Sequence, residues 1–344
     1  PHVSPDDSAL SRITRAGVAS TLPRLAGLLQ AGQDWAHSGV LEHRLEGKRG
    51  LPGNALWTPP ESPGAAWSTL ASPEQKAAAQ LPDTAQALWH KQAAWLRPRA
   101  LVQAQLAHPN ITWQGATRVE AIERMVGGWR LRGFCGVAAE PWVCEAETVV
   151  LASAFNTLAL LNTLGLQAPL NALRGQVTWG TVSSLPAHTA PFLPPFPVNG
   201  HGSFSHGMDF GLPATAHGPC WAVGSTFERG VTDPHILPTD QVANKARLAR
   251  LLPHVHSQCE PGMDAALAWA GVRCTVPDRL PMVGFLAPES WPGLMVCAGM
   301  GARGLTLSVL CGEVLAAQYF GEPWPLERKL ACALLAHRFA AKRV

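Results

Sequence analysis

A glycine-rich turn constrains the fold of this chain more than any other feature of its sequence. The turn Gly299–Gly304, with the sequence GMGARG, follows the apolar run 294–298 and precedes a helical pattern that continues to Tyr319. A strand, such a turn and a helix in this order are typical of α/β folds that bind a dinucleotide. A dinucleotide site also needs a second strand with an acidic residue about 20 residues further on. The chain nearly ends where that strand should stand.

This turn has three interpretations. It can hold a pyrophosphate, it can be a plain tight turn, or its helix end can face another electron-rich group. Backbone N–H groups at a helix N-terminus stabilise anions. We favour this third interpretation.

Segments of α/β type surround a β-rich middle. Residues 148–152 predict a buried strand followed by a helix, whereas residues 175–230 are rich in Pro, Gly and His and suggest an antiparallel sheet. The other predicted elements are helices at 10–29 and 241–252, a mostly helical stretch at 72–106, strands at 40–43 and 271–275, and a hairpin formed by 117–125 and 129–134. The sequence therefore predicts a mixed α/β (α+β) fold with two interleaved domains. One comprises residues 1–34, 107–175 and 268–344, and the other residues 35–106 and 176–267.

Composition limits the classes of function. Hydrophobic residues make up 47% and charged residues 15% of the 344 residues, which suits a large core, and the net charge of +3 permits an RNA partner without arguing for one. No apolar run reaches the roughly 20 residues of a membrane span. The eight cysteines lack a C-x-x-C pair, which favours reduced thiols in a cytoplasmic protein. His254, His256 and Cys259 have no second cluster to complete a metal site, so no metal is predicted.

Stretches along the whole chain carry a resemblance to a known family. They are His2–Asp7, Arg174–Val177, Gly224–Phe227 with Thr232-Asp233, Trp269–Cys274, Asp278–Gly284 and Gly301–Thr306. Together they resemble the FAD-dependent glycine/D-amino-acid oxidase family. Within it, the resemblance is greatest to the C-terminal oxidoreductase half of bifunctional enzymes that make 5-methylaminomethyl-2-thiouridine in tRNA.

The resemblance implies a Rossmann-like FAD-binding domain interleaved with an antiparallel-sheet substrate domain. The segments 1–34, 107–175 and 268–344 correspond to the first, and 35–106 and 176–267 to the second. Members of the family open with a strand, a glycine turn and a helix that hold the FAD pyrophosphate, and we expect this first turn to be absent here. The chain thus resembles a protein truncated at its N-terminus, and a methyltransferase half precedes the corresponding part of the bifunctional enzymes.

The implied reaction is the oxidation of a carboxymethylaminomethyl group on the tRNA wobble uridine to aminomethyl, with release of glyoxylate. A carboxylate of this kind favours a bidentate guanidinium. Arg273 and Arg303 match the two arginines that hold the substrate carboxylate in glycine-oxidase relatives, although without the resemblance each is an ordinary surface or structural residue. No general base is evident, because hydride transfer mainly needs an unprotonated amine placed over the flavin.

The resemblance also implies contacts to FAD. Val119 is expected near the adenine, and Ala152 and Ser153 near the pyrophosphate. The remaining expected contacts, all beside the flavin ring, are Arg174, Gly175, Gln176, Gly299, Gly301, Gly304, Leu305 and Thr306. Ordinary packing is the alternative for each.

Two other functions stay open. The first is oxidation of a small free amine such as glycine or sarcosine with the same cofactor. Tyr319 is the only tyrosine and lies far along the last long helix, so the active-site tyrosine of many amino-acid oxidases has no candidate, which weakens this alternative. The second is an inactive remnant that retains the fold without the cofactor.

Overall fold

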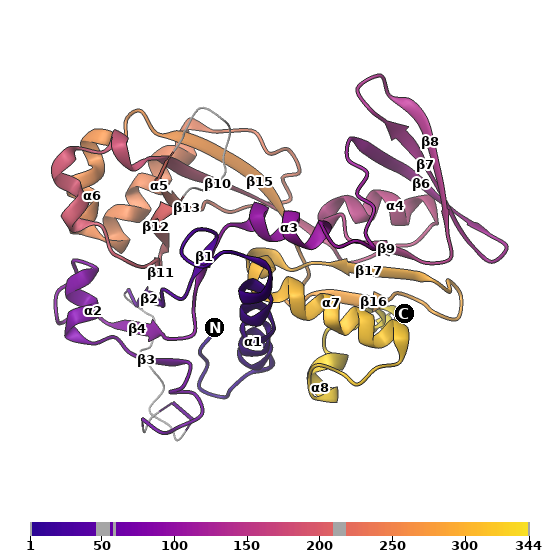
Figure 1. Ribbon diagram of the computed structural model, residues 1–344, viewed down its shortest axis with the longest axis horizontal. Helices are drawn as coiled ribbons and strands as arrows, with labels where there is room; N and C mark the ends of the chain where they lie inside the picture. The colour runs from indigo at the N-terminus through magenta and orange to yellow at the C-terminus, as the bar shows by residue number, and fades with distance from the viewer. Residues whose placement is uncertain (1, 46–55, 58–59, 209–217, 343–344) are drawn as a thin grey trace. The chain divides into compact units, whose positions relative to one another are not determined.

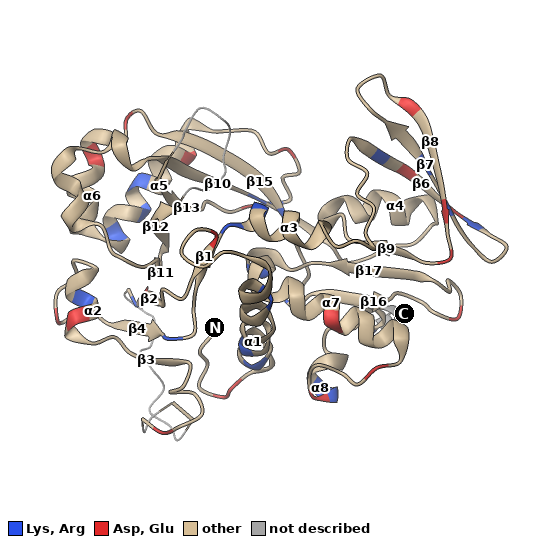
Figure 2. Ribbon diagram, viewed as in Figure 1, with Lys and Arg blue, Asp and Glu red and all other residues tan. Residues whose placement is uncertain are grey.

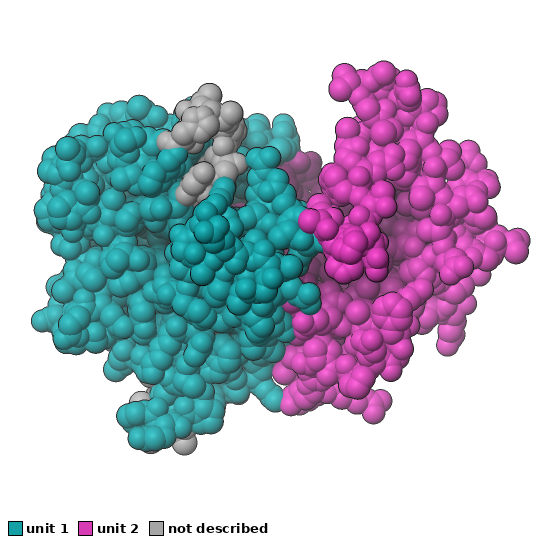
Figure 3. All heavy atoms as spheres, viewed as in Figure 1, with its two compact units in different colours: residues 1–105, 174–228, 233–271 teal, residues 106–173, 229–232, 272–344 magenta. Residues whose placement is uncertain are grey.

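The structure is a computed structural model that describes residues 2–45, 56–57, 60–208 and 218–342. Its contacts divide the chain into two compact units, coloured separately in Figure 3. Unit 1 comprises residues 1–105, 174–228 and 233–271, and unit 2 comprises 106–173, 229–232 and 272–344. Within the described residues, no helix combines the length and apolar character needed to cross a membrane.

Unit 1 is built on a large, mainly antiparallel sheet. Its strands follow the order β14-β10-β13-β12-β11-β2-β4-β3, with β15 also paired to β10. Strands β11 and β2 pair in parallel, with Val198 opposite Leu41. The strands are β2 (Val40–His43), β3 (Ser68–Leu70), β4 (Ala87–His90), β10 (Asn171–Thr181), β11 (Val198–Gly200), β12 (Gly202–Met208), β13 (Cys220–Gly224), β14 (Glu228–Arg229) and β15 (Leu267–Thr275). This sheet confirms the antiparallel pattern expected for residues 175–230.

Unit 1 also contains several α-helices. The α-helices are α1 (Ala9–Leu28), α2 (Pro73–Ala78), α3 (Pro98–Leu106), α5 (Pro238–Leu251) and α6 (Pro253–Cys259), and a small separate sheet pairs β1 (Trp35–Ala36) with β5 (Trp95–Leu96). Helix α5 packs on β12 and β13, as Figure 1 shows. Leu248 and Leu251 of α5 are fully buried there with Phe204 and Val223.

The stretch 72–106, predicted to be mostly helical, contains only the short helices α2 and α3. Between them, β4 pairs with both β2 and β3. Gln80 ends the first helical segment in a left-handed conformation with φ 56°. The Ala- and Gln-rich composition favours helix, but pairing with sequence-distant strands overrides this weak preference. The prediction is wrong for residues 79–97.

Unit 2 contains two three-stranded sheets. One has the order β6-β7-β8 and is antiparallel, formed by β6 (Thr117–Met125), β7 (Gly128–Cys135) and β8 (Glu140–Ala146). The other has the order β16-β17-β9, formed by β16 (Met282–Phe285), β17 (Leu294–Ala298) and β9 (Val149–Leu151). Strand β17 is antiparallel to β16 and parallel to β9. The predicted hairpin and both predicted strands are therefore confirmed, but β9 is not fully buried, because Val150 at its centre is 41% exposed.

The helices of unit 2 are α4 (Thr157–Thr163), α7 (Gly304–Phe320) and α8 (Arg328–Cys332), followed by a 3-10 segment, Ala336–Lys342. Helix α7 packs along β16 and β17, and α4 packs on β6, as Figure 1 shows. Helix α7 carries one charged residue, Glu313, and is otherwise tan in Figure 2. Buried Val296, Leu161 and Trp129 belong to one core cluster, in which Trp129 donates to the Pro292 carbonyl at 3.0 Å.

Contacts group residues 1–34 with unit 1, whereas the sequence assigned them to the domain formed by 107–175 and 268–344. The other predicted boundaries fall within a few residues of the divisions between the units. Contact grouping does not decide which unit carries a cofactor, so the functional domain assignment stays a prediction.

Candidate functional site

Two glycine- and serine-containing turns of unit 2 lie at one edge of its parallel strands. Strand β9 pairs in parallel with β17, with Leu151 opposite Val296. Their carboxyl ends therefore meet at the same edge of the sheet, where Ala152 and Ser153 follow β9 and Gly299 follows β17. Ala152 and Ser153 are both exposed there. This edge is where open α/β sheets bind ligands.

Glycine is required at the start of the turn after β17. Gly299 has φ +80°, a conformation that side chains disfavour, and a Cβ built on it would lie 2.3 Å from Cγ2 of Val276. Gly301 also has a positive φ, +57°, and its Cβ would lie 3.5 Å from Cγ2 of Thr275. The turn is thus shaped by close packing against the segment that follows β15.

Gly304 is a glycine for a different reason. It begins α7 with ordinary helical angles, φ −52° and ψ −50°, and a Cβ built on it would meet no atom within 4 Å. Leu305 is exposed beside it and Thr306 is half-buried. No side chain caps this end of α7. The start of the helix therefore faces open space, which a flat ligand can approach closely.

The two predicted carboxylate-binding arginines lie on adjacent segments of unit 2. Thr275, at the end of β15, forms an isolated antiparallel bridge with Met300. Arg273 precedes this bridge by two residues, and Arg303 follows it by three. Both are half-buried. Burial lowers the pKa of the Arg273 guanidinium, and burial together with the charge of Arg279 lowers the pKa of Arg303.

Arg303 is half-buried and directly precedes α7, so its guanidinium adds a positive charge to this helix N-terminus. The side chain of Arg303 forms no ion pair or hydrogen bond within the described parts of the chain. A desolvated cation favours an anionic partner, and a guanidinium pairs best with a carboxylate or phosphate. The arrangement can therefore bind a carboxylate next to the start of α7.

Sequence reasoning did not single out Arg279, whose charge acts on Arg303 from outside this site. Its turn, Val276–Leu280, packs against the glycine turn through the contact between Val276 and Gly299. Arg279 is exposed and has φ 62°. In the sequence, Arg279 stands next to the oppositely charged Asp278, and this adjacency suggests a neutral surface ion pair rather than a binding residue. In the structure Asp278 instead accepts hydrogen bonds from Arg338 at 3.0 and 3.2 Å.

Arg338 holds the Val276–Leu280 turn to the C-terminal segment. Besides its two bonds to Asp278, its guanidinium donates to the carbonyl of Leu280 at 2.9 Å. It also donates to the carbonyls of Leu334 and Leu335 at 2.8 and 3.0 Å. One side chain therefore links the turn that carries Arg279 to residues 334–338.

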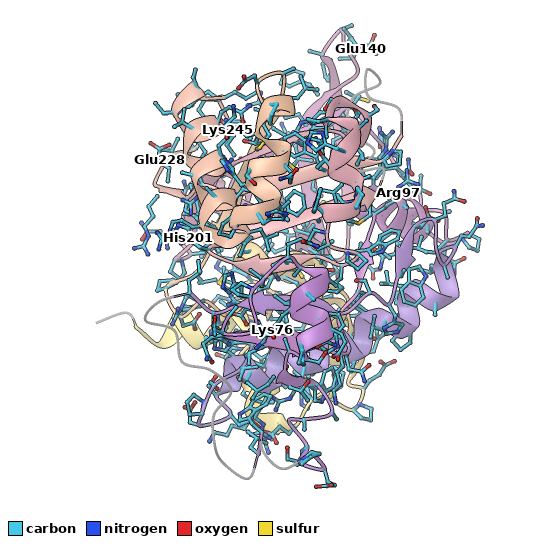
Figure 4. The ribbon with its side chains drawn as sticks, turned by 90° about the vertical axis from the view of Figure 1, so that its left-hand side faces the viewer. Lys76, Arg97, Glu140, His201, Glu228 and Lys245 are labelled. Carbon is cyan, nitrogen blue, oxygen red and sulfur yellow. The ribbon has the colours of Figure 1, made fainter. Side chains whose placement is uncertain are left out.

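The predicted FAD contacts Arg174, Gly175 and Gln176 lie in β10 and are buried. The Arg174 side chain is fully buried and pairs with Asp240 at 2.7 Å and with Glu228 at 3.3 Å. The Glu228 side chain, labelled at the left of the molecule in Figure 4, is 48% exposed, whereas that of Asp240 is 16% exposed. The guanidinium also donates to the His235 carbonyl and to Oε1 of Gln176.

Gln176 belongs to the same buried polar network. Its amide donates to the Leu237 carbonyl at 2.9 Å and accepts from the Leu237 N–H at 2.8 Å. Asn244 of α5 donates to the Gln176 carbonyl at 3.0 Å. These bonds give both side chains a structural role, fixing β10 to the segment that leads into α5. A contact between these residues and FAD stays a prediction.

Val119 lies apart from the two turns. It is half-buried in β6, opposite Gly133 of β7, and packs against the core of unit 2. A bulge follows directly, between Val119 and Ala121. The expected adenine contact stays a prediction.

A cavity of about 360 Å³ lies at the opposite end of the parallel strands. Glu147, Thr148, Pro292 and Gly293 line it, and these residues precede β9 and β17. The Thr148 hydroxyl donates to the Tyr319 hydroxyl at 3.3 Å at its wall. Because neither the glycine turn nor Arg303 lines this cavity, it is separate from the candidate site.

Comparison with known proteins identifies similar sequences. The model of the family described as FAD dependent oxidoreductase matches residues 3–318. The tRNA 5-methylaminomethyl-2-thiouridine biosynthesis bifunctional protein MnmC of Paracidovorax citrulli is 45% identical over 99% of this chain and 53% of its own length. The protein of the same name from Delftia acidovorans is 47% identical over 100% of this chain and 54% of its own length. The chain thus spans about half the length of these relatives.

Solved structures of similar fold are more distant in sequence. Glycine oxidase from Geobacillus kaustophilus gives a TM-score of 0.66 at 19% identity, covering 94% of this chain and 81% of that one. L-proline dehydrogenase from P. horikoshii gives a TM-score of 0.67 at 16% identity, covering 97% and 84%. These likenesses confirm the predicted mixed α/β fold class.

Proposed function

Since this chain belongs to the family of FAD-dependent oxidoreductases, we propose that it oxidises the carboxymethylaminomethyl group of a tRNA wobble uridine. The family resemblance predicted from the sequence is confirmed, and FAD is the cofactor of the family. The observation that carries the proposal is the 45–47% identity, over nearly all of this chain, to relatives named for tRNA modification. The structures named for free amines or amino acids share less than 20% identity and support the fold alone.

The candidate site fits a flavin. The open space above Gly304 allows a flat ring to approach the start of α7. The uncapped helix end favours negative charge there. Ala152, Ser153, Gly299, Gly301, Leu305 and Thr306 lie at or near the same edge of the sheet and are proposed to hold FAD together with Gly304. When bound, FAD supplies the acceptor for two electrons from a C–N bond.

The residues of this chain then bind and orient the substrate. We assign the substrate carboxylate to Arg273 and Arg303, which lie on two segments joined by the bridge between Thr275 and Met300. Bidentate binding fixes the position of the amine and its adjacent carbon. Oxidation of that carbon to an imine and hydrolysis by water release glyoxylate and leave an aminomethyl group on the uridine.

The location and partners follow from this substrate. A tRNA substrate places the protein in the cytoplasm, and the greater length of the relatives leaves room for a methyltransferase domain upstream in the full-length protein. We assign FAD binding to segments 107–175 and 268–344, and substrate binding to 35–106 and 176–267. The assignment of residues 1–34 to the FAD-binding domain is retained only as a prediction, given their contacts in unit 1.

The holoenzyme is expected to release one glyoxylate for each carboxymethylaminomethyl group lost from tRNA. Glyoxylate can be measured as a hydrazone, and the modified nucleoside by mass spectrometry after digestion. Unmodified tRNA and free sarcosine or glycine serve as parallel substrates. Turnover of the free amines with peroxide release, and none of the tRNA, would establish the small-amine alternative. A flavin-free protein without turnover would establish the inactive remnant.

Gly304→Val is expected to lower flavin content by at least about tenfold without lowering thermal stability. The helical angles of Gly304 tolerate a side chain, and its Cβ meets no atom within 4 Å, so the fold accommodates valine. The branched side chain instead occupies the space proposed for the flavin, at a cost of about 1–3 kcal/mol for overpacking. Absorbance at flavin wavelengths and a melting curve give the two readouts.

Gly312→Val is the matched control, because Gly312 lies exposed on the same helix and its Cβ also meets nothing within 4 Å. Gly293 is unsuitable, since it has φ +76° and its Cβ would lie 2.5 Å from the Glu147 carbonyl oxygen. If both valine variants retain full flavin content, the flavin does not lie at Gly304.

A further inference from the structure

Two turns of unit 2 bring a second arginine beside Arg303. The bridge between Thr275 and Met300 places the segment after β15 against the segment after β17. Next to this bridge, Val276 packs closely against Gly299, because a Cβ built on Gly299 would lie 2.3 Å from Cγ2 of Val276. Arg279 lies on the first turn and Arg303 on the second. Their charges are near enough that Arg279 lowers the pKa of Arg303.

The backbone holds Arg279 in a costly conformation. Its φ of 62° lies in the left-handed region, which costs a non-glycine residue roughly 1 kcal/mol or more. Its N–H donates to the Val276 carbonyl at 3.0 Å, and the next N–H, of Leu280, donates to the Asp278 carboxylate at 3.0 Å. The turn is thus fixed by its own hydrogen bonds. An arginine is not needed for that geometry, which asparagine or glycine adopts more readily.

The nearest acid does not neutralise Arg279. Asp278 is engaged by Arg338, at 3.0 and 3.2 Å. Across the described ranges, the Arg279 side chain forms no ion pair or hydrogen bond. Two neighbouring cations without an acid between them repel each other, so the fold alone gives no reason for both. An anion that binds between or beside them removes this repulsion.

We propose that Arg279 binds a backbone phosphate of the RNA substrate, next to the nucleotide whose modified group reaches Arg303. This inference rests on the proposed function. The modified group offers a single carboxylate, which Arg273 and Arg303 already match. Arg279 is exposed, as a contact to the sugar-phosphate backbone requires, and each RNA nucleotide carries one phosphate. A contact between Arg279 and a phosphate therefore favours a polyanionic RNA substrate over a small free amine.

The test is Arg279→Gln in the holoenzyme, with tRNA that carries the carboxymethylaminomethyl group. At low salt the KM for this tRNA should rise about three- to fivefold, as expected for one exposed charged contact. The slope of log KM against log salt should fall by about 0.7–1, the value for one phosphate. The kcat, the flavin content and any oxidation of free sarcosine should match the wild type. Arg279→Lys should retain most of the salt slope.

Arg328→Gln is the matched control, because it removes the same charge from an exposed position on α8 of the same unit. Equal KM and salt slope in the two glutamine variants would overturn the phosphate contact. A fall in kcat or flavin content in Arg279→Gln would overturn it as well, by giving Arg279 a role in the flavin site. A wild-type holoenzyme that does not oxidise the modified tRNA would overturn the proposed function itself. This outcome distinguishes failure of the proposed function from failure of the phosphate contact.

Discussion

Replacing Arg273 with alanine is expected to lower kcat/KM for the carboxymethylaminomethyl tRNA by at least about 30-fold, the equivalent of about 2 kcal/mol. Arg273 is half-buried, and burial lowers the pKa of its guanidinium, so a carboxylate bound to it would be partly desolvated as well. Removing one partner of a desolvated charged pair typically costs about 2–5 kcal/mol. The loss should appear mainly in KM, because the arginine binds the carboxylate before and during the reaction.

Flavin content is the second readout for this variant. Arg118→Ala is the control, since Arg118 is 81% exposed and pairs with Glu120 in β6. That variant should leave kcat/KM within about twofold of the wild type. If Arg273→Ala loses flavin in proportion to activity, Arg273 supports the fold or the cofactor, and its assignment to the carboxylate fails.

Replacing Arg174 with methionine is expected to lower the free energy of unfolding by about 3–5 kcal/mol. Arg174 is fully buried, and its loss leaves the mostly buried Asp240 carboxylate without its 2.7 Å partner. The His235 carbonyl and the Gln176 amide also lose a donor. Denaturant unfolding of the holoenzyme, followed by tryptophan fluorescence, measures the change.

Two control variants separate burial from charge. Arg118→Met removes an exposed guanidinium and should cost less than about 1 kcal/mol. Glu228→Gln changes the more exposed partner of Arg174 and should also cost little, because water already solvates half of that side chain. A loss for Arg174→Met no larger than for Arg118→Met would mean that the network adjusts without the guanidinium.

Local pattern was sufficient to predict much of unit 2. The predicted strand 294–298 has the same bounds as β17, because five apolar residues before a glycine favour a buried strand. The hairpin of β6 and β7 followed from alternating residues on both sides of a glycine pair. Helix α7 ends at Phe320, and Gly321 after it takes the left-handed conformation typical of the residue that follows a helix C-terminus.

Contacts between distant segments could not be predicted in this way. Nothing in the local sequence shows that Thr275 lies opposite Met300 or that Val276 packs against Gly299, and these contacts bring Arg279 near Arg303. The adjacent residues Asp278 and Arg279 suggest a neutral ion pair in the sequence. In the structure, the Asp278 carboxylate is instead bound by Arg338, sixty residues further along the chain. The motif of Arg174 predicts a cofactor contact, which stays a prediction, and only the tertiary structure reveals its ion pairs with Glu228 and Asp240.

The five hydrogen bonds of Arg338 couple the stability of the C-terminal segment to that of the candidate site. Proteins unfold locally in cooperative segments, and a side chain that is hydrogen-bonded to two segments couples their local unfolding. When residues 334–338 fray, Asp278 and Leu280 lose their donors together, and the turn that holds Arg279 loses its outer support. The amide protons of both segments should therefore exchange with solvent at a common rate, and a substrate that orders Arg279 should slow that exchange at the end of the chain.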